Sequence, residues 1–121
     1  MESKTLDAYN RLRKILDILR EECPWDKVQT IESLRYLTIE EVFELSEAIL
    51  STRQDPEQGN EEFCKELGDL FMHLIFYSKI AQDEGRFTES DVFDRISHKL
   101  VARHPFIDWS LHPEIGISTH S

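Results

Sequence analysis

Two acidic runs inside helix-periodic apolar sequence constrain the fold of this chain more than any other feature. They read Glu40-Glu41-Val42-Phe43-Glu44 and Glu66-Leu67-Gly68-Asp69. Side chains three or four residues apart share one face of a helix, so each run sets carboxylates side by side. Because the surrounding apolar residues turn these faces inward, and unpaired carboxylates are costly to bury, we expect two packed helices whose acids converge on a cation.

The spacing of the apolar residues predicts four helices along the chain. They are expected to cover approximately residues 5–22, 30–52, 60–84 and 88–103. Only four glycines and four prolines occur in the 121 residues, so few positions would interrupt a helix. We therefore expect an all-α bundle over residues 1–106, followed by a C-terminal tail over residues 107–121.

Local signals set two boundaries inside this bundle. Thr38 to Glu41 match a capping box, so the second helical stretch is expected either as one helix or as a short helix followed by a longer one. Residues 53–60 contain Asp55-Pro56 and Gly59, which are typical of a polar loop. Asn60 is then the expected N-cap of the third helix.

The net charge limits the classes of partner. With 14 basic and 24 acidic residues the net charge is −10, which disfavours binding to nucleic acid or to an anionic membrane. A phosphate substrate stays compatible, because bound cations invert the local field. Cys23 and Cys64 lack the spacing of a zinc ribbon and do not make a disulfide framework. The polar N-terminus and the short apolar runs favour a cytoplasmic location.

The acidic runs form a candidate metal site. If their helices pack antiparallel, Glu41 and Glu44 on one helix meet Glu66 and Asp69 on the other. A ligand set made only of oxygens is typical of a hard cation such as Mg²⁺ or Mn²⁺. Glu40 lies on a neighbouring face and is expected as an extra ligand or as a base. The alternative is a solvated acidic face, which the apolar surroundings disfavour.

Gly68 and His73, which lie beside the acidic residues, are expected to have different roles. Gly68 costs about 1 kcal/mol relative to alanine in a helix, so it predicts the close approach of another backbone or of a ligand. His73 lies one turn after Asp69 on an apolar helix and is expected to be a satisfied core histidine. No acid lies three residues before any histidine, which argues against a di-iron site.

Basic and aromatic residues elsewhere are open to two interpretations. Lys99 and Arg103 share a face near the end of the fourth helix, where cations favour the helix dipole in any case. Beside a metal–carboxylate cluster they would instead grip the oxygens of a polyphosphate. Trp25, in the loop after Pro24, is expected either to pack on the core or to belong to a functional loop.

Five motifs, taken in order, resemble the MazG family of nucleoside triphosphate pyrophosphohydrolases. They are Cys23-Pro24-Trp25-Asp26 with Gln29-Thr30, Glu40-Glu41-x-x-Glu44, Glu66-Leu67-Gly68-Asp69, the run from Ala81 to Phe87, and Lys99-Leu100 with Arg103-His104-Pro105. Their order and spacing agree over approximately residues 9–106. The resemblance therefore covers most of the chain.

The resemblance implies a four-helix MazG-like bundle that dimerises through its helices. It implies an enzyme that hydrolyses the α–β phosphoanhydride of (deoxy)nucleoside triphosphates to a nucleoside monophosphate and pyrophosphate. Mg²⁺ is the implied cofactor, with Mn²⁺ as a substitute. A homodimer or a higher homo-oligomer is expected, and neither nucleic acid nor a membrane is expected as a partner.

Roles are implied for the residues that match the family motifs. The expected Mg²⁺ ligands are Glu41, Glu44, Glu66 and Asp69, which with Glu40 as base make up the catalytic set. The residues expected at the nucleotide are Trp25, Glu40, Glu62, Lys65, Asp69, Lys99 and Arg103. Two alternatives stay open: a dUTPase-like hydrolase of the same all-α class, and a non-enzymatic acidic helical binding module.

Overall fold

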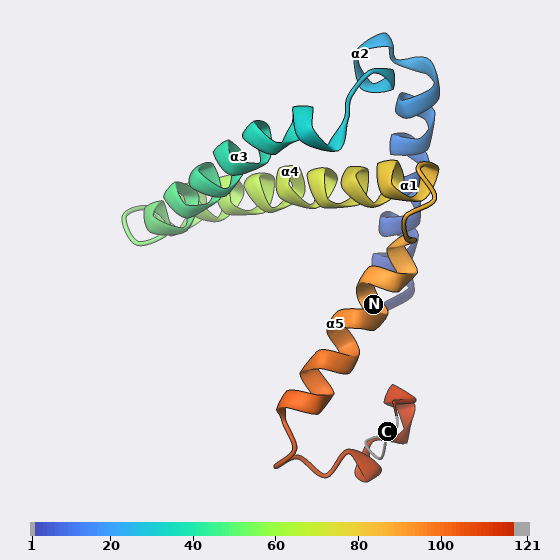
Figure 1. The fold of residues 1–121 in the computed structure, drawn as a ribbon. Helices are drawn as coiled ribbons and strands as arrows, with labels where there is room; N and C mark the ends of the chain where they lie inside the picture. Colours follow the sequence, from blue (N-terminus) through green and yellow to red (C-terminus); the bar gives the residue numbers. More distant parts are fainter. Residues whose placement is uncertain (1, 118–121) are drawn as a thin grey trace.

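The described part of the chain is all-α, as expected. A computed structural model describes residues 2–117, apart from the Glu2 side chain, and contains five α-helices and two short 3₁₀ helices in that range (Figure 1). They are α1 (Glu2–Glu22), α2 (Pro24–Lys27), α3 (Ile31–Ser51), α4 (Pro56–Asp83), α5 (Glu89–Arg103), η1 (Trp109–Leu111) and η2 (Pro113–Ile115). Among the described residues, every helix is too short or too polar to cross a lipid bilayer.

The second helical stretch is one continuous helix, α3. Its capping box is formed by Thr30 and Ser33, whose side chains each accept a hydrogen bond from the other residue's backbone N–H, at 3.0 and 2.9 Å. The expected capping box at Thr38 is wrong, because the Thr38 hydroxyl donates to the Leu34 carbonyl of the preceding turn at 3.1 Å. The acidic residues of α3 therefore lie in the middle of a rigid element.

Helix α4 begins earlier than expected. Asp55 is its N-cap and accepts a hydrogen bond from the backbone N–H of Gln58 at 3.2 Å, and Pro56 follows as the first helical residue. The predicted loop over residues 53–60 is confirmed for residues 53–55 and wrong for residues 56–60, and the predicted N-cap at Asn60 is wrong. Proline is preorganised for the first turn of a helix, where its missing N–H costs no hydrogen bond. The turn between α3 and α4 is consequently short.

Gly59 makes this short turn sterically feasible. It is buried in the first turns of α4, and a Cβ at this position would lie 2.6 Å from the Thr52 Cα and 2.9 Å from the Ser51 carbonyl oxygen. Only a residue without a side chain lets the two helix ends approach so closely. The mid-helix Gly68 is different, because a Cβ at this position would have no described atom within 4 Å apart from its chain neighbours and the adjacent backbone of its own helix. The expected approach of another backbone of the same chain to Gly68 is wrong.

The two glycines predict opposite effects of alanine on stability. We expect Gly59→Ala to lower the free energy of unfolding by about 1–3 kcal/mol, because the added methyl overpacks against backbone atoms. Gly68→Ala should raise it by up to about 1 kcal/mol, since alanine favours helix and meets open space. Urea denaturation of both variants checks this, and an unchanged midpoint for Gly59→Ala would contradict the tight turn.

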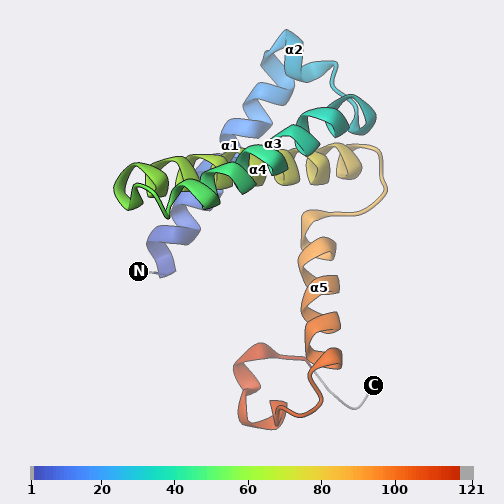
Figure 2. The same cartoon turned by 90° about the vertical axis from the view of Figure 1, so that its left-hand side faces the viewer.

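The core lies where α1 crosses the α3–α4 pair. Helices α3 and α4 run antiparallel and side by side, and α1 packs across them near the C-terminal end of α4 (Figures 1 and 2). An ion pair between Lys79 and Asp17, at 2.7 Å, also links α4 to α1. The buried cluster consists of Leu16, Leu34, Ile75, Phe76 and Ile80. This core fixes α3 against α4, the two helices that carry the acidic runs.

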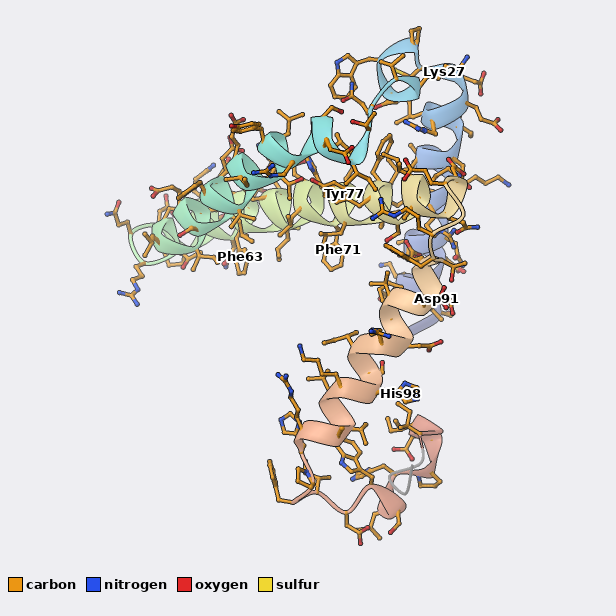
Figure 3. The ribbon with its side chains drawn as sticks, in the orientation of Figure 1. Lys27, Phe63, Phe71, Tyr77, Asp91 and His98 are labelled. Carbon is orange, nitrogen blue, oxygen red and sulfur yellow. The ribbon has the colours of Figure 1, made fainter. Side chains whose placement is uncertain are left out.

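Helix α5 extends away from the α3–α4 pair, so the four long helices do not close into a bundle within one chain (Figures 1 and 2). An ion pair between Arg13 and Glu89, at 3.5 Å, ties the start of α5 to α1. On α4, Phe63 and Phe71 lie on the side of the helix opposite to α3 (Figure 3), and Phe71 is 58% exposed. The apolar side of α5 is also exposed, through Val92, Phe93, Ile96 and Leu100.

Candidate metal and phosphate site

Three carboxylates converge between α3 and α4. Glu41 on α3 and the pair Glu66 and Asp69 on α4 each place a carboxylate oxygen within 4.8 Å of the others. Glu66 and Asp69 are one turn apart on α4, so the helix itself sets their spacing. Glu66 is only 5% exposed, and Glu41 and Asp69 are half-buried. The predicted convergence of these three acids is therefore present in a single chain.

The cluster contains more negative charge than its neighbouring cation, Lys65, can offset. Burial, together with a hydrogen bond to Glu66 and repulsion from the neighbouring acids, raises the pKa of Glu41 to about 7. Burial also disfavours the charged form of Glu66, but its hydrogen bonds to Lys65 and Glu41 outweigh this and lower its pKa. Lys65 Nζ lies 3.2 Å from Glu66 Oε1. In metal-free protein these opposite shifts favour the proton on Glu41 over the proton on Glu66.

Two buried oxygens of the cluster have no protein partner. Glu41 Oε2 and Glu66 Oε2 are inaccessible to solvent and accept no hydrogen bond from any described residue. Buried polar atoms without a partner are rare and costly in folded proteins. A divalent cation bound by oxygen ligands would satisfy both atoms and offset the charge of the cluster. The donor set therefore fits a hard divalent cation.

The raised pKa of Glu41 predicts a pH dependence of stability in metal-free protein. Folded Glu41 keeps its proton up to about pH 7, whereas the unfolded residue loses it near its ordinary pKa of about 4.5, so the folded state binds more protons between these values. Its contribution to stability is therefore fully present below about pH 4.5 and is lost progressively as the pH rises from there through about 7. Thermal denaturation in EDTA should show this fall for the wild type but not for Glu41→Gln. Identical pH profiles for the two proteins would contradict the assignment.

The other predicted ligands and neighbours lie around this cluster. Glu44 repels Glu41 and helps to raise its pKa, but it is exposed and lies outside the group of three. Glu40 is exposed on α3, and Glu62 is half-buried on α4. These residues flank the cluster on its two helices. Their roles stay predictions.

The basic residues expected at the phosphates do not reach the cluster within one chain. Lys99 and Arg103 are exposed on α5, the helix that extends away from α3 and α4 (Figure 1). Lys99 lines a cavity of about 1030 Å³ together with other residues from 87 to 98, and no carboxylate of the cluster lines it. The acidic and basic halves of the predicted site are therefore separate in a single copy.

The segment after α1 was predicted as a loop but contains the short helix α2, and it is held by Arg20, a residue for which no role was predicted. Arg20 donates to the backbone carbonyls of Asp26 and Gln29 at 2.7 and 2.8 Å. Trp25 is 57% exposed, so packing on the core is wrong for this residue. Only its position just before a Pro-containing turn marks Arg20 in the sequence.

The described core also contains a satisfied histidine. His73 is 7% exposed and its Nδ1 lies 2.8 Å from the Thr38 hydroxyl, so the predicted core role is confirmed. Thr38 and Tyr77, which complete this contact, were not predicted to interact. Their pairing depends on helix packing and leaves no signal in local spacing.

Comparison with known proteins places this geometry in context. Residues 29–107 match the MazG nucleotide pyrophosphohydrolase domain model. The chain is 39% identical over 105 residues to nucleoside triphosphate pyrophosphohydrolase of Escherichia coli strain K12, covering 84% of this chain and 38% of that protein. It is 39% identical over 101 residues to nucleoside triphosphate pyrophosphohydrolase/pyrophosphatase MazG of Thermotoga maritima, covering 82% and 37% of the two proteins.

A third relative matches this chain over an even smaller share of its own length. Protein YabN of Bacillus subtilis is 41% identical over 101 residues, which are 82% of this chain and 19% of that protein. The chain thus spans only 19% to 38% of the length of these three relatives. The similarity therefore concerns one part of each larger protein.

Proposed function

The chain belongs to the MazG nucleotide pyrophosphohydrolase family, and from this premise we propose that it hydrolyses nucleoside triphosphates to a nucleoside monophosphate and pyrophosphate with the help of Mg²⁺. The observation that carries the proposal is the convergence of Glu41, Glu66 and Asp69 with two buried oxygens that lack a partner. The relatives named for this activity support the reaction class.

The cation would be held between α3 and α4. Glu41, Glu66 and Asp69 would ligate it, and Glu44, one turn along α3, would complete the acidic set. When bound, Mg²⁺ or Mn²⁺ neutralises phosphate charge and lowers the pKa of coordinated water. Glu41 must lose its proton for this binding, because its pKa of about 7 leaves it largely neutral in mildly acidic solution.

The proposed reaction is the hydrolysis of the nucleoside triphosphate by attack of water at the α-phosphorus. A water oxygen forms a bond to the α-phosphorus in line with the bond to the bridging oxygen, which breaks so that pyrophosphate leaves. Glu40, exposed beside Glu41, would accept the proton of the water. Lys65, which now contacts Glu66, would be free to turn toward the nucleotide once a cation takes over the carboxylate charge.

A second copy of the chain would complete the site. Lys99 and Arg103 carry the charge needed for a triphosphate, but α5 holds them away from the cluster of its own chain (Figure 1). Phe71 on α4 and the apolar residues of α5 are exposed in a single copy of the chain. In a homodimer these apolar surfaces would cover one another, and α5 of one copy would bring its basic residues to the α3–α4 pair of the other.

Product analysis tests the reaction. The chain is incubated with a panel of canonical and damaged NTPs and dNTPs, with Mg²⁺ and with EDTA, and the products are separated by chromatography. We expect monophosphate and pyrophosphate in the presence of Mg²⁺ only. Activity confined to dUTP would favour the dUTPase-like alternative. Orthophosphate as the first product would overturn the proposed bond cleavage, and no turnover of any nucleotide would favour a binding module.

A further inference from the structure

One threonine hydroxyl joins α3 and α4 beside the carboxylate cluster. Thr38 Oγ1 on α3 lies 2.8 Å from His73 Nδ1 and within hydrogen-bond distance of the Tyr77 hydroxyl, both on α4. His73 is buried, and Thr38 and Tyr77 are half-buried. These three residues are called the polar clasp. It is a directional contact between the two helices that also carry the carboxylate cluster.

Proton counting assigns the donors of the polar clasp. The Leu34 carbonyl, 3.1 Å from Thr38 Oγ1, can only accept, so it takes the single hydroxyl proton of Thr38. The Tyr77 hydroxyl and the Nδ1–H of His73 then both donate to the Thr38 oxygen. This arrangement satisfies every contact when His73 is neutral with its proton on Nδ1. Burial, opposed only in part by the charge of Asp69, lowers the pKa of His73 and favours the neutral ring.

The polar clasp lies one turn from the cluster on both helices. Thr38 precedes Glu41 by three residues, and His73 follows Asp69 by four residues. Helices α3 and α4 are antiparallel (Figure 1). One helical turn toward the C-terminus of α3 and one turn toward the N-terminus of α4 therefore lead in the same direction, from the polar clasp to the carboxylate cluster. The two features therefore share the same axial register of the helix pair.

We propose that the polar clasp sets the α3–α4 register at which Glu41 meets Glu66 and Asp69, which makes Thr38, His73 and Tyr77 positioning residues for the cation site. The inference rests on the cation-binding part of the proposed function. A slip of one residue moves Glu41 by about 1.5 Å along its helix, while cation–ligand distances tolerate about 0.2 Å. Apolar packing alone accepts alternative arrangements more readily than directional hydrogen bonds do.

Paired variants of Thr38 separate the hydroxyl from the shape of the side chain. Thr38→Val keeps the shape and removes the oxygen, and Thr38→Ser keeps the oxygen and removes a methyl. Mn²⁺ binding to the full chain is measured by calorimetry without nucleotide. We expect Thr38→Val to weaken Mn²⁺ affinity about 10–100-fold, as the loss of groups that orient metal ligands does. Thr38→Ser should stay within about 3-fold of the wild type.

Two further variants keep the test interpretable. Ile75→Val removes one buried methyl group from the core and lowers stability without changing a residue of the polar clasp. We expect it to leave Mn²⁺ affinity unchanged, which would show that a loss of stability does not by itself weaken Mn²⁺ binding. Tyr77→Phe removes one hydrogen-bond donor and should weaken Mn²⁺ affinity by a smaller factor than Thr38→Val. The Tyr77→Phe variant tests the inference even if Thr38→Val does not fold. The ¹⁵N chemical shifts of His73 should report the neutral Nδ1–H tautomer in the wild type.

The outcomes separate this inference from the function it rests on. Equal Mn²⁺ affinity in wild type, Thr38→Val and Tyr77→Phe would overturn the role of the polar clasp and leave the cation site standing. Equal weakening by Thr38→Val and Thr38→Ser would also overturn it, because the serine variant keeps the hydroxyl and affinity would then not depend on that group. Absence of Mn²⁺ binding by the wild type would overturn both the cation site and the inference.

Discussion

Replacing Glu66 by glutamine is expected to reduce nucleotide hydrolysis and divalent cation affinity by about 100-fold or more. The reason is that Glu66 is the most buried acid of the cluster and holds an oxygen without a protein partner. Loss of a group that merely orients a ligand costs about 10–100-fold in metal affinity, and loss of a ligand should cost at least as much. The measurement is steady-state pyrophosphate release, together with Mn²⁺ titration of the same preparation.

The fold should survive this substitution. Glutamine keeps the shape of the side chain and removes the repulsion that Glu41 experiences, so the metal-free variant should unfold at the same temperature as the wild type or higher. Glu61→Gln, an exposed change on the same helix outside the cluster, is the matched control and should keep full activity. Wild-type activity in Glu66→Gln would remove this residue from the site.

Mixing two inactive variants is expected to restore activity. One carries Glu66→Gln and the other carries Lys99→Ala with Arg103→Ala. We assume that Lys99 and Arg103 on α5 of one chain act at the carboxylate cluster of the other. Random exchange of chains then makes half of the dimers mixed. Each mixed dimer has one intact site and one inactive site. The mixture should therefore regain about a quarter of wild-type activity.

A second mixture controls for this complementation. Glu41→Gln mixed with Glu66→Gln should stay inactive, because both residues belong to the cluster of one chain. Native mass spectrometry, with one variant of each mixture labelled with ¹⁵N, verifies that mixed dimers have formed. If they have formed and the first mixture also stays inactive, Lys99 and Arg103 do not act in trans, and the proposed assembly is wrong.

The parts of the site that the sequence predicted are those with local spacing. Glu66 and Asp69 share a face because a helix repeats every 3.6 residues, and that holds wherever the helix is placed. Glu41 meets them because α3 and α4 are joined by a short turn that leaves antiparallel packing as the compact arrangement. The all-α fold followed from the same periodicity, since few glycines or prolines interrupt it.

The parts that could not be predicted depend on competing signals or distant contacts. Asp55-Pro56 is typical of a turn and also of a helix start, and Gly59 looked like part of a loop until its contact with Thr52 was known. Thr38 pairs with residues 35 and 39 positions away. Helix α5 extends away from the α3–α4 pair (Figure 1), which leaves its apolar residues exposed in one chain. None of these features has a local pattern that points to a single structure.

The exposed side of α5 has a consequence for how the chain would work at different concentrations. Under the proposed assembly, a functional site forms only on encounter of two chains, so the fraction of working sites follows mass action. Specific activity would then rise with protein concentration and level off once association is complete. Dilution alone would act as an inhibitor, and raising the substrate concentration would counter it by stabilising the associated form.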